Sequence, residues 1–221
     1  MPRENRRVRV KGPDLLLGDE VTWVEAVLPT GGAGPDAIKE LEPGTSGWVP
    51  HDALKLRLLS AIREKLGKYE RYRATHVLTP TDRYVVAVGG CAISSAKREQ
   101  TIPRIVSSVL PFGAEQVHLD ATTLQVIGHS FLHQPSVRKE SGAQVSTTLF
   151  QDPSSAPISA VMYAWADEIN RPDFPGSEFV IVHNPLAANP LPLGFFPFGT
   201  EYWFRDGKLN FNHQEPANQV S

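Results

Sequence analysis

The sequence predicts an α+β protein, with a mixed sheet flanked by helices and a β-rich C-terminal extension. Residues 51–73 place apolar side chains at helical spacing, and the runs 21–28 and 83–88 on either side of them are typical of buried strands. The second half of the chain holds further strand-like runs between polar connections. With 221 residues, 41% apolar and 21% charged, the chain has globular composition.

The remaining elements follow from local patterns. Residues 7–11 alternate polar and apolar, which indicates a strand, and the run resumes at 14–17 after Gly12-Pro13. Residues 101–110 are expected to form a helix with Pro103 in its first turn. Asp206-Gly207 predicts a hairpin. The other expected strands are 115–120, 123–134, 143–150, 158–166, 178–183, 201–204 and 208–212.

These patterns predict one domain over residues 1–212, with a core at 7–110, the extension at 115–212 and a flexible tail at 213–221. The single cysteine, Cys91, excludes an intramolecular disulfide and is expected to be a buried small thiol. No apolar run approaches the roughly 18 residues of a membrane span, and no secretory signal is visible. A cytoplasmic location without membrane contact is therefore expected.

Charge is unevenly distributed along the chain. Residues 1–11 and 51–73 each carry a net charge of +4, although the whole chain carries −2. Two basic segments beside an acidic pair would suit a phosphodiester backbone, so nucleic acid is the expected partner. A solvated helix face with a frayed basic tail explains the same charges without any ligand.

Glu25 is the one charged residue in the strand 21–28. The strand is apolar on both faces, as central strands are, and a lone carboxylate there is costly without a cation or several donors. Asp14 lies one turn and one strand upstream, so pairing of the two strands would bring the carboxylates together. Two converging carboxylates suit a hard divalent cation such as Mg²⁺. The alternative is a turn-capping Asp14 and a structurally paired Glu25.

Pro13-Asp14 followed by Trp23-Val-Glu25-Ala-Val27 resembles the PD-(D/E)XK nuclease superfamily, which has the restriction-endonuclease-like fold. The resemblance covers about residues 8 to 90. The chain also looks like a group of uncharacterised bacterial proteins, which share this start and an ending like His183-Asn184-Pro185. The superfamily resemblance implies an Mg²⁺-dependent endonuclease or exonuclease, with metal held by Asp14, Glu25 and the Ala26 carbonyl.

The chain departs from the family pattern at two points. Val27 occupies the position of the family lysine, and in some members that lysine comes from the following helix instead. Lys65 lies inside the apolar stripe of the helix, where lysines are rare unless paired, so it is the expected third catalytic residue with Asp14 and Glu25. Its ammonium could equally reach water along a buried stem. Lys55 shares the arc, but fraying of the first turn is expected to expose it.

The second departure is that only 13 residues precede Asp14, too few for the helix and strand that the fold normally has there. A truncated chain, a homo-oligomer or a partner chain completing the core would account for this. Lys55, Arg57 and Lys68 are the expected phosphate-binding residues.

Two other functions remain open at this stage. The chain could be a non-catalytic nuclease-fold protein used for nucleic-acid binding or assembly, as Val27 suggests. It could also be a β-rich small-molecule enzyme whose pocket is lined by His118, His129 and His133. Those histidines have no third ligand at a recognised zinc spacing.

Overall fold

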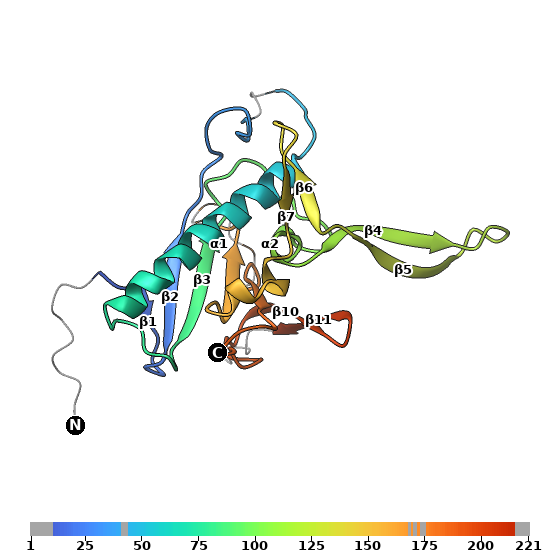
Figure 1. Ribbon diagram of the computed structural model, residues 1–221. Helices are drawn as coiled ribbons and strands as arrows, with labels where there is room; N and C mark the ends of the chain where they lie inside the picture. The colour runs from blue at the N-terminus through green and yellow to red at the C-terminus, as the bar shows by residue number, and fades with distance from the viewer. Residues whose placement is uncertain (1–10, 41–43, 168, 170–171, 173–175, 215–221) are drawn as a thin grey trace.

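The computed structural model describes residues 11–40, 44–167, 169, 172 and 176–214. It has a mixed α/β fold of the α+β kind, so the predicted class is confirmed. A long helix crosses one face of a seven-stranded sheet, and a two-stranded arm projects from the body (Figure 1). Two short strands, β6 and β7, form a separate small sheet. No helix in the described part of the chain is long and apolar enough to cross a membrane.

The main sheet has the order β1-β2-β3-β8-β9-β10-β11. The parallel pairs are β2–β3, β3–β8 and β9–β10, and the other neighbours are antiparallel. Its strands are β1 (Leu15–Leu16), β2 (Thr22–Val27), β3 (Arg83–Gly89), β8 (Ala160–Ala164), β9 (Val180–His183), β10 (Gly199–Arg205) and β11 (Lys208–Gln214). The other elements are α1 (His51–Ala74), α2 (Arg104–Val109), β4 (Phe112–Leu119), β5 (Val126–His133), β6 (Ser136–Arg138), β7 (Gln144–Ser146) and the 3₁₀ turns Leu149–Gln151 and Pro153–Ser155.

Helix α1 is the crossover between the parallel strands β2 and β3. Its apolar stripe, with Leu54, Leu58 and Ile62 fully buried, packs on the face of the sheet that carries Tyr84 and Val86. A smaller apolar cluster, which includes Val85 and Ile181, covers the opposite face. Because side chains alternate along a strand, β3 supplies both cores from neighbouring residues.

Strands of the predicted extension are divided among three sheets, one of which is the separate pair β6 and β7. β8 to β11 complete the main sheet, so the two halves of the chain share one sheet, and β4 and β5 form the projecting arm. The strand expected at 143–150 ends at Ser146. Thr147 donates its backbone N–H to Pro135 O and its hydroxyl to Gln134 O, which turns the chain into a 3₁₀ turn.

Chain ends fit the expectations in part. Most of the strand expected at 7–11 lies outside the described residues, and so does 215–221 of the expected tail. His213 and Gln214, which were assigned to that tail, belong to β11.

Two glycines with left-handed backbone conformation allow the packing at the start of β10 to be tested by substitution. Both Gly199 (φ +83°) and Gly207 (φ +75°) would strain an L-residue, but a Cβ on Gly199 would also lie 2.5 Å from Phe179 O. No atom lies within 4 Å of such a Cβ on Gly207. We expect Gly207→Ala to cost about 1 kcal/mol of unfolding free energy and Gly199→Ala about 3 kcal/mol, measured by urea denaturation. Equal losses would contradict the described approach of Phe179.

Candidate functional site

Pairing of β1 with β2 brings Asp14 beside Glu25. Leu15 pairs with Val24 and Leu16 with Trp23, and one further step in this antiparallel register sets Asp14 opposite Glu25. Residues directly opposite each other present their side chains on the same face. Asp14, which is exposed, is held at this sheet edge because its Oδ2 accepts a hydrogen bond of 2.8 Å from the Ala26 N–H. The predicted meeting of the two strands is confirmed.

Glu25 lies beneath α1 with only 2% of its surface exposed. Its Oε1 contacts Lys68 Nζ at 2.8 Å and Lys65 Nζ at 3.2 Å. Its Oε2 accepts a hydrogen bond of 2.9 Å from the Tyr72 hydroxyl. The buried carboxylate therefore has both the cation and the several donors that its position in an apolar strand requires.

Helix periodicity delivers all three donors to Glu25. Lys65, Lys68 and Tyr72 follow one another at spacings of three and four residues, so they share one face of α1. The Tyr84 hydroxyl, from the neighbouring strand β3, donates to the backbone oxygen of Lys65 at 3.0 Å and ties this turn to the sheet. The predicted approach of Lys65 to the acidic pair is confirmed at Glu25.

Lys68 and Tyr72 are the members of this cluster that the sequence analysis missed. Lys68 was expected to bind phosphate, and Tyr72 was assigned no role. Helical spacing places both residues on the same face as Lys65, but it does not show which residues of that face reach Glu25.

Hydrogen bonds and charges within the cluster favour the ionised forms of Glu25 and Lys68. Burial would raise the pKa of Glu25, but hydrogen bonds from Lys68, Tyr72 and Lys65 outweigh it and hold that pKa below its ordinary value. The hydrogen bond to Glu25 is the chief reason that the pKa of Lys68 is raised. Burial, followed by the hydrogen bond and the charge of Glu25, raises the pKa of Tyr72 to about 12. Asp14 also contributes to that shift, so its charge acts on the same cluster.

Because Pro13 has no N–H, the Ala26 carbonyl lacks the backbone hydrogen bond that the opposite residue of an antiparallel strand normally donates. The register sets Pro13 opposite Ala26, and the N–H and C=O of one strand residue point to the same side. The Ala26 N–H is taken by Asp14, whereas proline has no N–H to donate to the Ala26 carbonyl. A carboxylate and a backbone carbonyl therefore face the same edge of the sheet beside Glu25, which is the type of oxygen set that Mg²⁺ prefers.

The fit to a divalent ion has one condition, which concerns Glu25. Both of its oxygens have donors in the described structure, so a metal ion could share this carboxylate only if an ammonium moved away from Oε1. Within the described ranges, no group of three or more His, Cys, Asp or Glu side chains is arranged to hold a metal. Binding of Mg²⁺ by Asp14, Glu25 and the Ala26 carbonyl therefore stays a prediction that requires rearrangement at Glu25.

A hollow of about 450 Å³ opens next to Asp14, at the carboxyl ends of β2 and β3. Its walls are mainly apolar, and Asp14 is the one charged residue among those that line it. The lining residues are Asp14, Ala26, Val27, Leu28, Ala87, Val88, Gly89, Met162, Ala164 and Phe179. Val27, at the position where the superfamily resemblance implies a lysine, is one of the residues that line this hollow.

The three expected phosphate-binding residues contact three different segments. Lys55 is 3% exposed and donates to Gln134 Oε1 at 2.8 Å, so the expectation that fraying exposes it is wrong. Tight packing of the first turn of α1 against the base of the arm is the reason. Arg57 donates its Nε to Thr30 O at 3.0 Å, and Lys68 binds Glu25. The structure does not gather these cations into one patch, and their phosphate role stays a prediction.

The three histidines do not converge on one pocket. They lie on β4 and β5, where the register places His118 on the face opposite His129. His129 Nδ1 contacts Glu115 Oε1 at 2.7 Å, and His118 Nε2 contacts Ser130 Oγ at 2.7 Å. The pocket expected of a small-molecule enzyme in this region is therefore not formed by these side chains.

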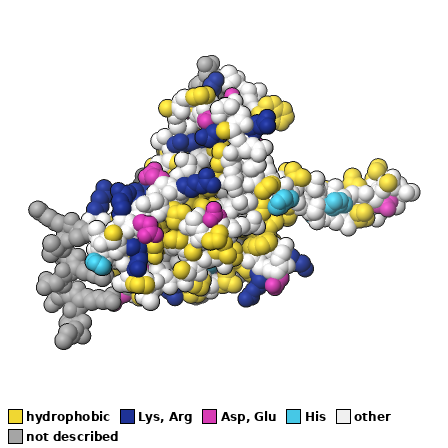
Figure 2. Space-filling model, viewed as in Figure 1, with side chains coloured by type: hydrophobic (Ala, Val, Ile, Leu, Met, Phe, Trp, Pro, Cys, Tyr) yellow, Lys and Arg dark blue, Asp and Glu magenta, His cyan; other side chains and the backbone are white. Residues whose placement is uncertain are grey.

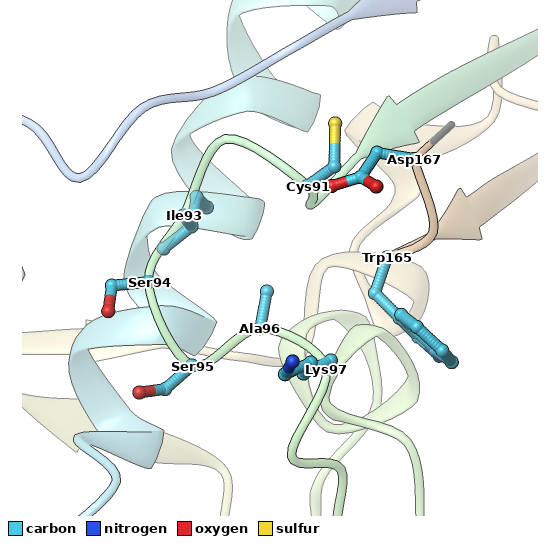
Figure 3. Close-up of a pocket in the computed structure, with 8 residues that line it drawn as sticks. All are labelled: Cys91, Ile93, Ser94, Ser95, Ala96, Lys97, Trp165 and Asp167. Carbon is cyan, nitrogen blue, oxygen red and sulfur yellow. The ribbon is translucent and has the colours of Figure 1, made fainter. Parts of the chain in front are cut away.

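Cys91 is exposed, which corrects the expected buried thiol, because it lies in the turn after β3. It lines a hollow of about 180 Å³ with Trp165, Asp167 and residues 93–97. In Figure 3 the Cys91 thiol and the Asp167 carboxylate lie near each other, and the Ser94 and Ser95 hydroxyls point away from Trp165. Its lining holds no histidine that could activate a thiol.

Comparisons with known proteins assign the chain to no family. No protein-family model, curated protein or solved structure matches it. The resemblance of Pro13-Asp14 and Glu25 to the PD-(D/E)XK superfamily therefore stays a prediction.

Glu25→Gln is expected to lower the unfolding free energy by about 3 kcal/mol at neutral pH, because it leaves two ammonium groups facing a neutral amide in a buried site. The pKa of Glu25 is lowered by folding, so its contribution is complete above the ordinary value of 4.5 and is lost as pH falls through the lower, folded value. The wild type should therefore lose more stability than Glu25→Gln on acidification. Urea denaturation at neutral and acidic pH measures both.

Glu70→Gln, an exposed change on the same helix, is the matched control and should leave the unfolding free energy nearly unchanged. Parallel acid profiles for the wild type and Glu25→Gln would show that the Glu25 cluster does not stabilise the fold.

Proposed function

We propose that this protein is a nuclease-like hydrolase that cleaves phosphodiester bonds of nucleic acid at the Asp14–Glu25–Lys65 site. The observation that carries the proposal is the position of the Lys65 ammonium, 3.2 Å from the buried Glu25 carboxylate. Glu25 lies on β2, and the pairing of β2 with β1 brings Asp14 beside it. An acidic pair and an ammonium in one place are the groups that such hydrolysis needs. The resemblance of Pro13-Asp14 to the nuclease superfamily supports the same reaction.

Each residue has a separate task in this proposal. Asp14 is exposed at the sheet edge, where a substrate phosphate and its water can reach it. Lys65 donates a hydrogen bond to the attacking water, and Glu25 positions its ammonium. Lys68 and Tyr72 hold the Glu25 carboxylate from its other sides, so it keeps its orientation.

Mg²⁺ is the proposed cofactor, held by Asp14, Glu25 and the Ala26 carbonyl. When bound, such an ion activates water and offsets charge on the phosphodiester. Lys65 and Lys68 both carry positive charge next to the same carboxylate, so binding of the ion and pairing of these ammonium groups compete at Glu25.

A basic surface near the site supports nucleic acid as the substrate class. Several Lys and Arg side chains, interspersed with Asp and Glu, lie on the face of the molecule over α1 (Figure 2). Arg63 and Arg71 are exposed on this helix. A cytoplasmic location, which the single cysteine suggests, belongs to the same proposal.

A second candidate is a nuclease-fold protein that binds nucleic acid without cleaving it. It is favoured by the donors on both Glu25 oxygens and by the apolar Val27 at the position of the family lysine. A Glu25 carboxylate whose charge is always paired with Lys65 and Lys68 would keep a structural role and lose its chemistry.

Purified full-length protein, incubated with end-labelled DNA and RNA and with Mg²⁺ or Mn²⁺, distinguishes the two candidates. For the hydrolase, we expect cleavage that chelator abolishes and that Lys65→Met lowers by about 10²–10³-fold, because it removes the ammonium donor and its positive charge from the site. Asp14→Asn should abolish cleavage as well. Asparagine keeps a side-chain oxygen that can accept the Ala26 N–H, so the variant should unfold at the same temperature as the wild type.

Glu70→Gln is again the control and should cleave like the wild type. Absence of cleavage in the wild type with every metal and substrate would overturn the hydrolase. Binding that weakens linearly on a log–log plot against salt, and that Asp14→Asn leaves intact, would then support the second candidate.

A further inference from the structure

β4 and β5 form an arm (residues 112–133) that leaves the body of the molecule (Figure 1). The two strands pair only with each other, as a sheet separate from the main one. An isolated two-stranded ribbon is marginally stable in water unless one of its faces is covered. The arm therefore raises the question of what covers it.

The register gives the arm two different faces. One face carries the opposed pairs Glu115–Phe131, Val117–His129 and Leu119–Val126. Val117, Leu119 and Val126 on this face are 51%, 52% and 55% exposed. The opposite face carries Gln116, His118 and Ser130, which are joined by hydrogen bonds. The first face presents this row of large apolar side chains to solvent, and Ile127 and Leu132, elsewhere on the arm, are 67% and 48% exposed.

That apolar face continues onto the main sheet. Phe131 contacts Phe112, and Phe112 contacts Phe204 of β10, with ring centroids 6.5 and 6.0 Å apart. Tyr202 lies on the same face of β10 two residues earlier, and it contacts Phe211 of β11 at 5.9 Å. Phe211 is 68% exposed. We call this surface, from the arm to β11, the apolar strip.

β11 is the last strand of the main sheet, so its outer backbone edge has no partner strand among the described residues. The edge is seven residues long, and Lys208 at one end is its only charged side chain. Long edges with few charges are the ones that pair with another chain. The arm projects from the body on the same side as β11 (Figure 1).

Charge distinguishes between the candidate occupants of the apolar strip. Residues 112–133 contain Glu115 and Asp120 but no lysine or arginine, so a phosphate backbone would be repelled. The tip of the β10–β11 hairpin carries Arg205 and Lys208 beside Asp206, an opposite net charge. The arm of one copy thus complements the hairpin tip of another.

We propose that a second copy of this chain covers the apolar strip. The β11 edges of the two copies pair antiparallel about a two-fold axis, and each arm lies over the aromatic face of the partner's β10–β11 hairpin. Such an interface is self-complementary, as two-fold symmetry demands. It also keeps the lysine at one end of β11 away from its symmetry mate. The dimer does not depend on the site around Glu25.

Sedimentation of the full chain over a range of concentrations tests the dimer. We expect the wild type to dimerise, and Val126→Asp and Phe211→Asp each to weaken the dimer about tenfold or more, since each charge occurs twice in a symmetric apolar interface. His118→Gln, on the other face of the same arm, is the matched control and should dimerise like the wild type. Thermal unfolding at low concentration should be the same for all four proteins, because the altered side chains are exposed in the monomer.

A wild type that stays monomeric at every concentration would overturn the proposal. So would a dimer that both charged variants leave intact. Salt-dependent binding of a DNA or RNA duplex that Val126→Asp abolishes would assign the strip to nucleic acid instead and would equally overturn it.

Discussion

The buried Glu25 carboxylate joins the sheet to its long helix. It stands on β2, whereas its three donors, Lys65, Lys68 and Tyr72, come from successive turns of α1. The apolar stripe of α1 would allow the helix to slide or rotate on the sheet, because apolar contacts have no direction. Hydrogen bonds to one buried carboxylate fix both the rotation and the position of α1.

This constraint explains several features that would be costly alone. Two lysines on the inner face of a helix are unfavourable without a partner, and so is a glutamate in an apolar strand. Together they satisfy one another, and the Tyr84 hydroxyl binds the helix backbone at the same turn. The same arrangement makes the chemistry conditional, since the donors that hold the carboxylate in place also occupy the oxygens that a metal ion would use.

At the β11 end of the sheet, the monomer leaves more apolar surface in contact with solvent. The core under α1 is fully buried, whereas the arm and the β10–β11 hairpin keep large apolar side chains in solvent. The proposed site and the apolar strip lie at opposite ends of the strand order, near β1 and at β11. A dimer formed through β11 would therefore leave both copies of the site accessible.

From the sequence alone, α1, β2, β3 and the β10–β11 hairpin could be predicted, because periodicity and turn residues are local signals. The same reasoning brought together Asp14, Glu25 and Lys65. A charged side chain among apolar neighbours requires a partner, and this applies to Glu25 in its strand and to Lys65 in its helical stripe. Only the tertiary structure decided which groups meet. Lys68 and Tyr72 bind Glu25, and the Lys55 side chain points inward and donates to Gln134. Such contacts could not be predicted, because they depend on how a helix is rotated against distant strands. Local patterns also did not predict that β8 to β11 join the same sheet as β2, or that β4 and β5 lie outside it. These pairings join strands that are distant in the chain, and the residues of one strand do not specify such a partner.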